Sequence, residues 1–152
     1  MKNWHLRKAR PDDATALAVC FELAYSIYAK QINDLPAVSE GVADDIANNL
    51  VWVAESDGGI VGGVVLVLQA NYAILANVAV TPFASGTGLG KALVEQAEYT
   101  CRELKIPNIR LSTHAKMPKN VSLYEYLGWH VTNREGNKVH MEKTVVSHDN
   151  LT

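Results

Sequence analysis

The sequence of 152 residues predicts an α/β fold whose sheet contains both parallel and antiparallel strands. The first indication comes from residues 72–113, where an apolar strand, an amphipathic helix and a second strand follow one another, an order that implies a parallel strand pair. The second is a hairpin turn on either side of this segment, at residues 56–59 and 135–137. The length suits one domain, which we expect over residues 1–145, with a C-terminal tail at 146–152.

Strands are predicted where runs of β-forming residues lie between turn signals. These runs cover residues 4–7, 51–55, 60–68, 72–80, 109–113, 129–134 and 139–144. The second and third runs are joined by a Ser-Asp-Gly-Gly turn and should pair antiparallel, as should the last two.

Helices are predicted where apolar residues recur with the helical period. The first helix begins at the Pro-Asp-Asp of residues 11–13, and the last covers about residues 118–127. The second, with Ser39 as its cap, follows a polar link at residues 30–36. The expected buried positions are Leu17, Phe21, Ala24 and Tyr28 in the first helix, Val42, Ile46 and Leu50 in the second, and Leu89, Leu93, Ala97, Cys101 and Leu104 in the third, which Pro107 ends.

Composition argues against several classes of protein. With 14 basic and 16 acidic residues the net charge is -2, so there is no basic surface for a nucleic-acid partner. The longest aliphatic run, residues 64–68, is too short to cross a bilayer and the N-terminus is polar, so we expect a cytoplasmic protein without a membrane partner. Cys20 and Cys101 lack metal-ligand spacing and the five histidines are scattered, so we expect reduced thiols and no metal.

The most informative segment is the glycine-rich turn between strand 72–80 and the third helix. Residues 85–91 read Ser-Gly-Thr-Gly-Leu-Gly-Lys. The first amides of a helix have no intrahelical partner, and the helix dipole adds positive charge at that end. Glycines at 86, 88 and 90 allow a ligand to approach the main chain closely. The turn is therefore predicted to bind a phosphate group.

Two nucleotide-binding motifs do not fit this turn. A Walker loop needs a hydroxyl residue after Gly-Lys and a glycine at the position of Ser85, but Ala92 follows Lys91. The dinucleotide fingerprint needs a third glycine where Lys91 or Leu93 stands.

The turn instead resembles the acyl-CoA pyrophosphate loop of the GNAT superfamily of N-acyltransferases, written Arg/Gln-x-x-Gly-x-Gly/Ala. Ser85, Gly88 and Gly90 occupy its three defined positions. A second segment, residues 123–129, reads Leu-Tyr-Glu-Tyr-Leu-Gly-Trp and is similar to the Leu-Tyr-Glu-x-Leu-Gly-aromatic string at the fourth helix of GNAT chains. The resemblance covers nearly the whole chain. It implies an α/β, GNAT-type fold: a mixed, mostly antiparallel sheet with a central splayed parallel strand pair, flanked by helices.

The resemblance also implies a binding mode for the cosubstrate, acetyl-CoA. Pantetheine would lie between the splayed strands and pair with the backbone of Val78 and Val80, and the Val78 amide would polarise the thioester carbonyl. The CoA-binding residues implied are Val78, Val80, Ser85, Gly86, Thr87, Gly88, Leu89, Gly90, Lys91 and Asn120. A buried strand at 72–80 is equally expected, because this chemistry uses main-chain groups.

Tyr124 matches the tyrosine that protonates the departing CoA thiolate in many members. An unperturbed phenol, with a pKa near 10, stays protonated at neutral pH and can donate to a thiolate. The alternative is a helix tyrosine that only packs its ring. Tyr126 is two residues away, but 124 is the motif position.

The chain departs from the family pattern at two positions. Ser85 replaces the usual Arg or Gln, which removes one contact to pyrophosphate. Lys91 replaces that contact if its ammonium folds back, or is simply solvated in the first helical turn. Many relatives carry Asn where Met117 stands. Asn120 is the nearest polar substitute, unless it is only an N-terminal helix residue.

A general base is not evident in the sequence. Residues 73–77 include no carboxylate, and the Asn77 amide cannot take up a proton. His114, just past strand 109–113, is either a base near the cleft or a surface histidine. Glu22, Asp44 and Asp45 lie on the two helices that border the acceptor site in this family, where they would attract an amine or form a solvated face.

The resemblance therefore implies an N-acetyltransferase that moves an acetyl group from acetyl-CoA directly to a primary amine through a ternary complex. The acceptor is a small molecule or a peptide. The alternative is a non-catalytic GNAT-fold module that senses acyl-CoA or binds a partner. The acceptor has no motif, and the sequence leaves a homodimer open.

Overall fold

The computed structural model describes residues 3–26, 28, 32 and 40–145. The Ser39 cap, most of the link at 30–36 and the tail at 146–152 lie outside the described residues.

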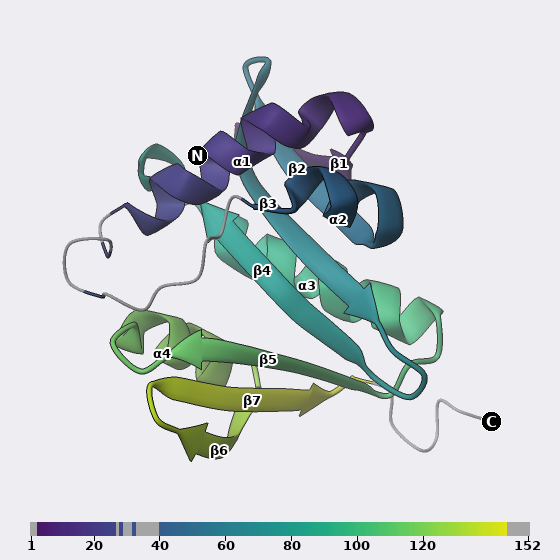
Figure 1. The fold of residues 1–152 in the computed structure, drawn as a ribbon, viewed down its shortest axis with the longest axis vertical. Helices are drawn as coiled ribbons and strands as arrows, with labels where there is room; N and C mark the ends of the chain where they lie inside the picture. Colours follow the sequence, from purple (N-terminus) through teal and green to yellow (C-terminus); the bar gives the residue numbers. More distant parts are fainter. Residues whose placement is uncertain (1–2, 27, 29–31, 33–39, 146–152) are drawn as a thin grey trace. The chain divides into compact units, whose positions relative to one another are not determined.

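One mixed sheet runs through the fold, with the strand order β1-β2-β3-β4-β5-β7-β6 (Figure 1). Its strands are β1 His5–Lys8, β2 Leu50–Ser56, β3 Gly59–Leu68, β4 Ala73–Val80, β5 Asn108–His114, β6 His130–Glu135 and β7 Lys138–Thr144. Pairs β1–β2, β2–β3, β5–β7 and β6–β7 are antiparallel, and β4–β5 is parallel. The predicted mixed, mostly antiparallel sheet with one parallel pair is confirmed.

Helices flank the sheet. They are α1 Ala14–Tyr25, α2 Val42–Asn48, α3 Leu89–Glu103 and α4 Pro118–Tyr126, with 3-10 turns η1 Pro11–Asp13 and η2 Pro82–Ala84. No helix among the described residues is long and apolar enough to cross a membrane.

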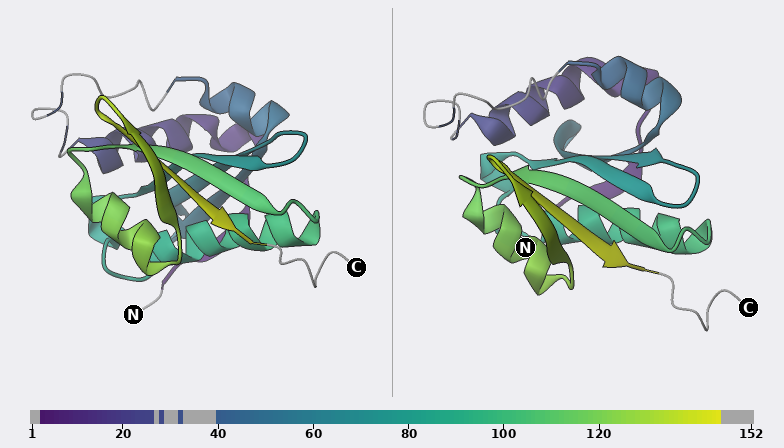
Figure 2. Two further views of the ribbon diagram at one scale, coloured as in Figure 1. Left: turned by 90° about the horizontal axis from the view of Figure 1, so that it is seen from below. Right: turned by 60° about the horizontal axis from the view of Figure 1, so that its bottom comes forward.

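The contacts divide the chain into two compact units. The first comprises Met1–Leu66 with Asn77–Val94, and the second Val67–Ala76 with Glu95–Thr152, so β3, β4 and α3 contribute residues to both. In the first unit α1 and α2 lie over one face of β1, β2 and β3 (Figure 1). In the second unit α4 lies beside β5 and the β6–β7 hairpin (Figure 2).

Two adjacent glycines in β3 let helices approach both faces of the strand. A Cβ at Gly62 would lie 2.9 Å from Leu89 Cδ2 of α3, and a Cβ at Gly63 would lie 2.5 Å from Leu17 Cδ1 of α1. Because successive strand residues point to opposite faces, each glycine opens one face. Leu17, Leu89 and Leu93 are consequently fully buried in the core of this unit.

Three expected helix positions were wrong, because the helices end earlier than their apolar patterns. Leu50 belongs to β2, where it pairs with Leu66, since α2 ends at Asn48 and Asn49 is extended. Tyr28 lies beyond the end of α1 at Tyr25. Leu104 follows α3 and is 50% exposed.

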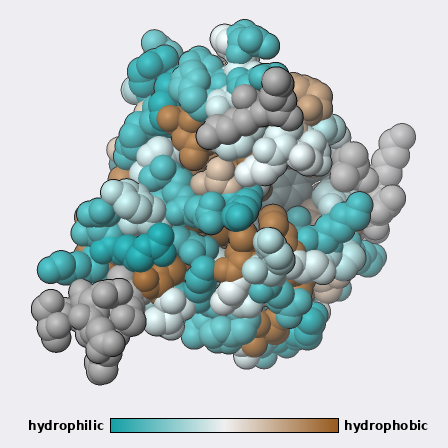
Figure 3. Space-filling model, turned by 180° about the vertical axis from the view of Figure 1, so that it is seen from behind, coloured by the Kyte–Doolittle hydropathy of each residue, from teal (hydrophilic) through white to brown (hydrophobic). Residues whose placement is uncertain are grey.

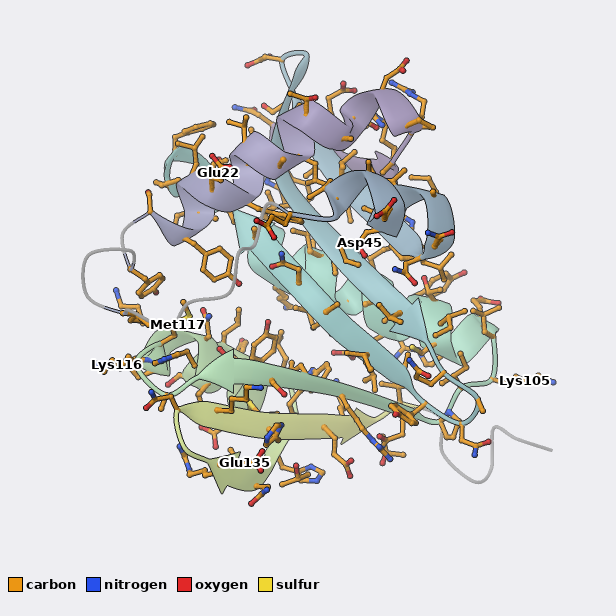
Figure 4. The ribbon with its side chains drawn as sticks, in the orientation of Figure 1. Glu22, Asp45, Lys105, Lys116, Met117 and Glu135 are labelled. Atoms are coloured by element: carbon orange, nitrogen blue, oxygen red, sulfur yellow. The ribbon has the colours of Figure 1, made fainter. Side chains whose placement is uncertain are left out.

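The end of α3 has a specific cause. Lys105, labelled in Figure 4, has φ +59°, Ile106 N–H donates to Cys101 O (2.8 Å), and Lys105 N–H donates to Arg102 O (3.1 Å). This is a Schellman motif with lysine at a position that glycine usually fills. Lysine there offers no sequence signal for a helix end, which is why the apolar pattern extends the predicted helix to Leu104.

Candidate functional site

The glycine-rich loop lies in the first unit, between β4 and α3. Pro82–Ala84 form η2, and Ser85 is extended. Gly86 (φ +80°) and Gly88 (φ +83°) both adopt the left-handed region, which costs about 1–2 kcal/mol for other residues. The local path therefore requires glycine at both positions, and helix α3 begins directly afterwards at Leu89.

The loop presents a row of main-chain donors without main-chain partners. Ser85 N–H donates to Pro82 O (3.2 Å), and Ala92 N–H donates to Gly88 O (3.1 Å). Between them, the amides of residues 86–91 donate to no backbone carbonyl of the described chain. A Cβ built at Gly86 or Gly88 would meet nothing within 4 Å, so space is open beside these amides. A phosphate group needs both features.

Two side chains of the loop face the protein instead. The Thr87 hydroxyl accepts a hydrogen bond from Trp4 Nε1 (3.0 Å) and donates to Ala84 O (2.6 Å), which braces the loop. Leu89 is buried against Gly62. Only the main chain of these residues is left for a ligand, whereas Ser85 and Lys91 are exposed.

The strand that precedes the loop contains the two expected valines. Val78 and Val80 are half-buried, with the buried Ala79 between them. The pairing of β4 with β5 joins Ala73 to Ile109 and Ile74 to Arg110, at the beginning of β4.

Tyr124 lies in the second unit, where it is 9% exposed, whereas Tyr126 is 78% exposed. Its ring centroid is 5.6 Å from that of Trp129. The backbone N–H of Trp129 donates to the backbone carbonyl of Tyr124 (2.9 Å). Gly128 has φ +96°, so the Leu-Gly of the motif turns the chain back at the end of α4. This turn places the aromatic residue of the motif against Tyr124.

A buried ionic cluster supports this pair and was missed in the sequence. Glu98 on α3 is 3% exposed, and its carboxylate accepts from Trp129 Nε1 (3.1 Å) and from Lys143 Nζ (2.7 Å). Lys143 Nζ also donates to Leu127 O (2.6 Å). A glutamate among the apolar positions of α3 was the available signal. Tryptophan in place of the usual phenylalanine has a clear role here, because only the indole supplies a donor to Glu98.

The polar residues around the start of α4 are partly engaged with one another. Asn120 Nδ2 contacts Met117 Sδ (3.4 Å), so these two side chains adjoin. Met117 is buried at the beginning of the helix (Figure 4). His114 Nδ1 accepts from the backbone N–H of Lys116 (3.0 Å). The lone pair of Nδ1 is therefore used in this hydrogen bond.

The acidic residues of the two early helices do not form one cluster of free carboxylates. Asp45 Oδ1 accepts from Asn49 Nδ2 (3.0 Å) and so closes the end of α2, while Asp44 and Glu22 are exposed. Glu22 on α1 and Asp45 on α2 are labelled in Figure 4.

The second unit contains a pocket of about 450 Å³ in its sheet. Buried residues alternate with accessible ones along β5 and β7, so Arg110, Ser112, His140 and Glu142 lie on the same face. The lining residues are Tyr72, Ile74, Leu75, Ala76, Arg110, Leu111, Ser112, Thr132, His140, Met141 and Glu142. No motif marked this pocket in the sequence.

The two cysteines lie in the core. Cys20 and Cys101 are buried free thiols, and burial raises the pKa of Cys20 to about 12 and that of Cys101 to about 11. Among the described residues there is no group of three or more His, Cys, Asp or Glu side chains that could hold a metal ion. On the face shown in Figure 3, hydrophobic residues are scattered among hydrophilic ones.

Comparison with known families places the chain. Residues 47–131 match the acetyltransferase (GNAT) domain, more than half of the sequence. The protein belongs to the GNAT acetyltransferase family, as the two sequence motifs indicated. A comparison with curated proteins found no match.

Solved structures show the same fold at low sequence identity. The PaiA N-acetyltransferase from Thermoplasma acidophilum, solved in complex with coenzyme A, has a TM-score of 0.85 at 22% identity, over 94% of this chain and 99% of that one. Ard1 from Thermoplasma volcanium has a TM-score of 0.75 at 18% identity, over 96% and 100%. The ribosomal-protein-S18-alanine N-acetyltransferase from Escherichia coli has a TM-score of 0.74 at 17% identity, over 93% and 94%.

Proposed function

We propose that this protein is an N-acetyltransferase that transfers the acetyl group of acetyl-CoA directly to a primary amine in a ternary complex. The observation that carries the proposal is the loop at residues 85–91, in which left-handed glycines and unpartnered amides open a helix of 15 residues. Membership of the GNAT acetyltransferase family supports acyl-CoA as the donor. The coenzyme A complex of the Thermoplasma acidophilum relative supports the same cosubstrate.

In this proposal the pyrophosphate of CoA binds to the amides of residues 86–91. Thr87 and Leu89 contribute main-chain groups only, because their side chains are engaged inside the protein. Ser85 and Lys91 are exposed beside the loop and adjust the affinity. The positive end of the α3 dipole adds to the attraction.

The main chain of β4 then holds the reacting end of the cosubstrate. Val78 and Val80 pair with the pantetheine amides, and the Val78 amide donates to the thioester oxygen as negative charge develops on it. One donor of this kind lowers the activation free energy by about 2.7–4 kcal/mol.

Tyr124 is the acid for the leaving group. As the tetrahedral intermediate collapses, the C–S bond breaks and the thiolate takes the phenol proton. The phenolate then recovers a proton from the nitrogen that has become the amide. The burial of Tyr124, in contrast to the exposure of Tyr126, supports this choice between the two tyrosines.

The loop assignment is tested with two matched glycine variants. Gly88→Ala places a methyl group in the open space proposed for the pyrophosphate, whereas Gly58→Ala places one in equally open space in the β2–β3 turn, at φ +80°. Both carry the same left-handed strain, so both should lose about 1–2 kcal/mol of stability. Only Gly88→Ala should lose CoA affinity, measured by isothermal titration calorimetry on folded protein. Equal CoA affinity in the two variants would refute the loop assignment.

Turnover is then measured as release of CoA thiol with a panel of primary amines: spermidine, lysine and a peptide that begins with alanine. Transfer to any of them above the hydrolysis background supports the enzyme. CoA binding without turnover of any amine would instead favour a non-catalytic acyl-CoA sensor.

A further inference from the structure

Three polar side chains in the second unit form a hydrogen-bonded chain at the pocket. Ser112 Oγ is 2.7 Å from His140 Nδ1, and His140 Nε2 is 3.3 Å from Glu135 Oε1. The three residues come from the neighbouring strands β5, β7 and β6, and the register of the sheet brings them together, with Ser112 paired to His140. Glu135 is labelled at the end of β6 in Figure 4.

The distances fit the following proton arrangement for a neutral imidazole. If the Ser112 hydroxyl donates to Nδ1, the imidazole is neutral and carries its proton on Nε2, which donates to the Glu135 carboxylate. A histidine held in this way can take up a proton through its serine neighbour, and the carboxylate then stabilises the imidazolium. The His140 side chain is 30% exposed, so it is within reach of a ligand.

The other ionisable groups on this face are largely engaged. Glu142 forms an ion pair with Arg110, with 3.6 Å between Oε2 and Nε. Its Oε1 lies 3.8 Å from His130 Nε2. The Arg110 guanidinium stacks over the Tyr72 ring at 3.9 Å. The titratable or charged groups that face His140 from β4 to β7 are Tyr72, Arg110, His114, His130, Glu135, Lys138 and Glu142.

The pocket adjoins the strand that the proposed reaction uses. Tyr72, Ile74, Leu75 and Ala76 of β4 line it. Val78 follows Ala76 by two residues on the same strand, which is about 7 Å at about 3.3 Å per residue. An amine bound against Ala76 would therefore contact the same strand two residues along the chain from the amide proposed to hold the thioester.

We propose that the pocket is the acceptor site and that Ser112 and His140 accept the proton of the incoming amine, with Glu135 as a positioning residue. This inference rests on the proposed function. It supplies the general base that the sequence did not reveal.

The proton balance is as follows. The acceptor ammonium gives a proton to Ser112 Oγ while the Ser112 proton passes to His140 Nδ1, so the ammonium becomes a nucleophilic amine and the imidazole becomes imidazolium. The amine attacks the thioester carbon, the C–S bond breaks, and Tyr124 protonates the thiolate and is reprotonated from the amide nitrogen. Imidazolium finally releases one proton to water, which matches the net reaction of ammonium and acetyl-CoA to amide, CoA thiol and a proton.

The test compares pH profiles of kcat/KM for the amine that the wild-type protein turns over, from about pH 6 to about pH 9. His140→Gln should lose at least about a hundredfold near pH 7, and the deficit should shrink as the pH approaches the pKa of the amine, because free amine then needs no base. The bend of the wild-type profile should coincide with the titration midpoint of the His140 ring, followed by NMR. His5→Gln, which changes an exposed histidine of the first unit, should match the wild type.

Conservative variants separate a chemical role from a structural one. Ser112→Ala should lose activity and Ser112→Thr should retain most of it, because the hydroxyl is kept. Glu135→Ala should reduce the rate, and Glu135→Gln should restore much of it through its amide oxygen. CoA affinity should be unchanged in all of them.

Two results overturn the inference by itself: a His140→Gln deficit that is the same at every pH, or a profile bend that does not follow the His140 titration. A wild-type protein that acetylates none of the amines refutes the proposed function, and the inference with it.

Discussion

Replacing Trp129 by phenylalanine tests how the buried cluster holds Tyr124, the residue proposed as the acid. The change keeps an aromatic ring against Tyr124 and removes the Nε1–H that donates to Glu98 at 3.1 Å. Glu98 is 3% exposed, so water cannot replace the lost donor. A hydrogen bond to a charged group contributes about 1.5–3 kcal/mol, and the smaller ring adds a cavity cost. We expect a loss of about 3 kcal/mol in the free energy of unfolding.

A double-mutant cycle isolates the hydrogen bond from the cavity. Urea unfolding is measured for the wild type, for Trp129→Phe, for Glu98→Leu, which has no acceptor, and for the double variant. Because Glu98 also accepts from Lys143 at 2.7 Å, Glu98→Leu alone leaves that ammonium short of its charged partner. The coupling between the two positions should be at least about 1 kcal/mol. Additive effects, within about 0.5 kcal/mol, would show that the indole–carboxylate contact contributes no stability and would refute the reasoning.

Three further outcomes are expected. Ser85→Arg should tighten CoA binding about tenfold or more, with a gain that shrinks at high salt; unchanged affinity in calorimetry would show that residue 85 points away from the phosphates. Tyr124→Phe should lower the transfer rate by about 10²–10⁴-fold while CoA affinity stays constant, and undiminished turnover would remove Tyr124 from the mechanism. Asp13 accepts two hydrogen bonds from Arg7 (2.8 and 3.0 Å), and this partner lowers its pKa from 3.8 to about 2. The pair should therefore contribute about 2 kcal/mol of stability above about pH 4 that is lost as the pH falls through 2, and Asp13→Asn should flatten the acid limb of the urea-unfolding profile; identical limbs would contradict this.

Local patterns predicted the order and type of every described strand and α-helix, but not the two 3-10 turns, Pro11–Asp13 and Pro82–Ala84. The alternation of strand residues and the apolar stripe at Leu89, Leu93, Ala97 and Cys101 depend on neighbours a few positions away, and all four of these side chains are buried. Helix ends were less predictable. The end of α3 depends on a left-handed Lys105, a conformation that the residue type does not announce.

In the candidate site, too, features set by local sequence were predictable, and contacts between distant residues were not. Glycines at a strand-to-helix junction predict the loop, because glycine alone adopts left-handed backbone conformations without strain. The pairs Glu98–Trp129 and Ser112–His140 are separated by 31 and 28 residues, and they meet only through packing and strand register. Neither can be inferred from one sequence, since a shift of the register by one residue would turn His140 to the other face.

The hydrogen bond from Trp4 Nε1 to the Thr87 hydroxyl spans 83 residues, and the same hydroxyl donates to the carbonyl of Ala84 in the glycine-rich loop. Loss of the Thr87 hydroxyl removes the acceptor of this indole N–H, and loss of Trp4 removes the contact that holds the hydroxyl, whereas a joint change to two apolar residues removes both groups together. Positions 4 and 87 should therefore be inherited as a pair: a lineage that replaces one without the other should lose the geometry of the loop, and with it the CoA affinity that we propose for this loop. Relatives that have diverged to about 22% identity, such as the Thermoplasma acidophilum enzyme, are where such paired replacements should appear.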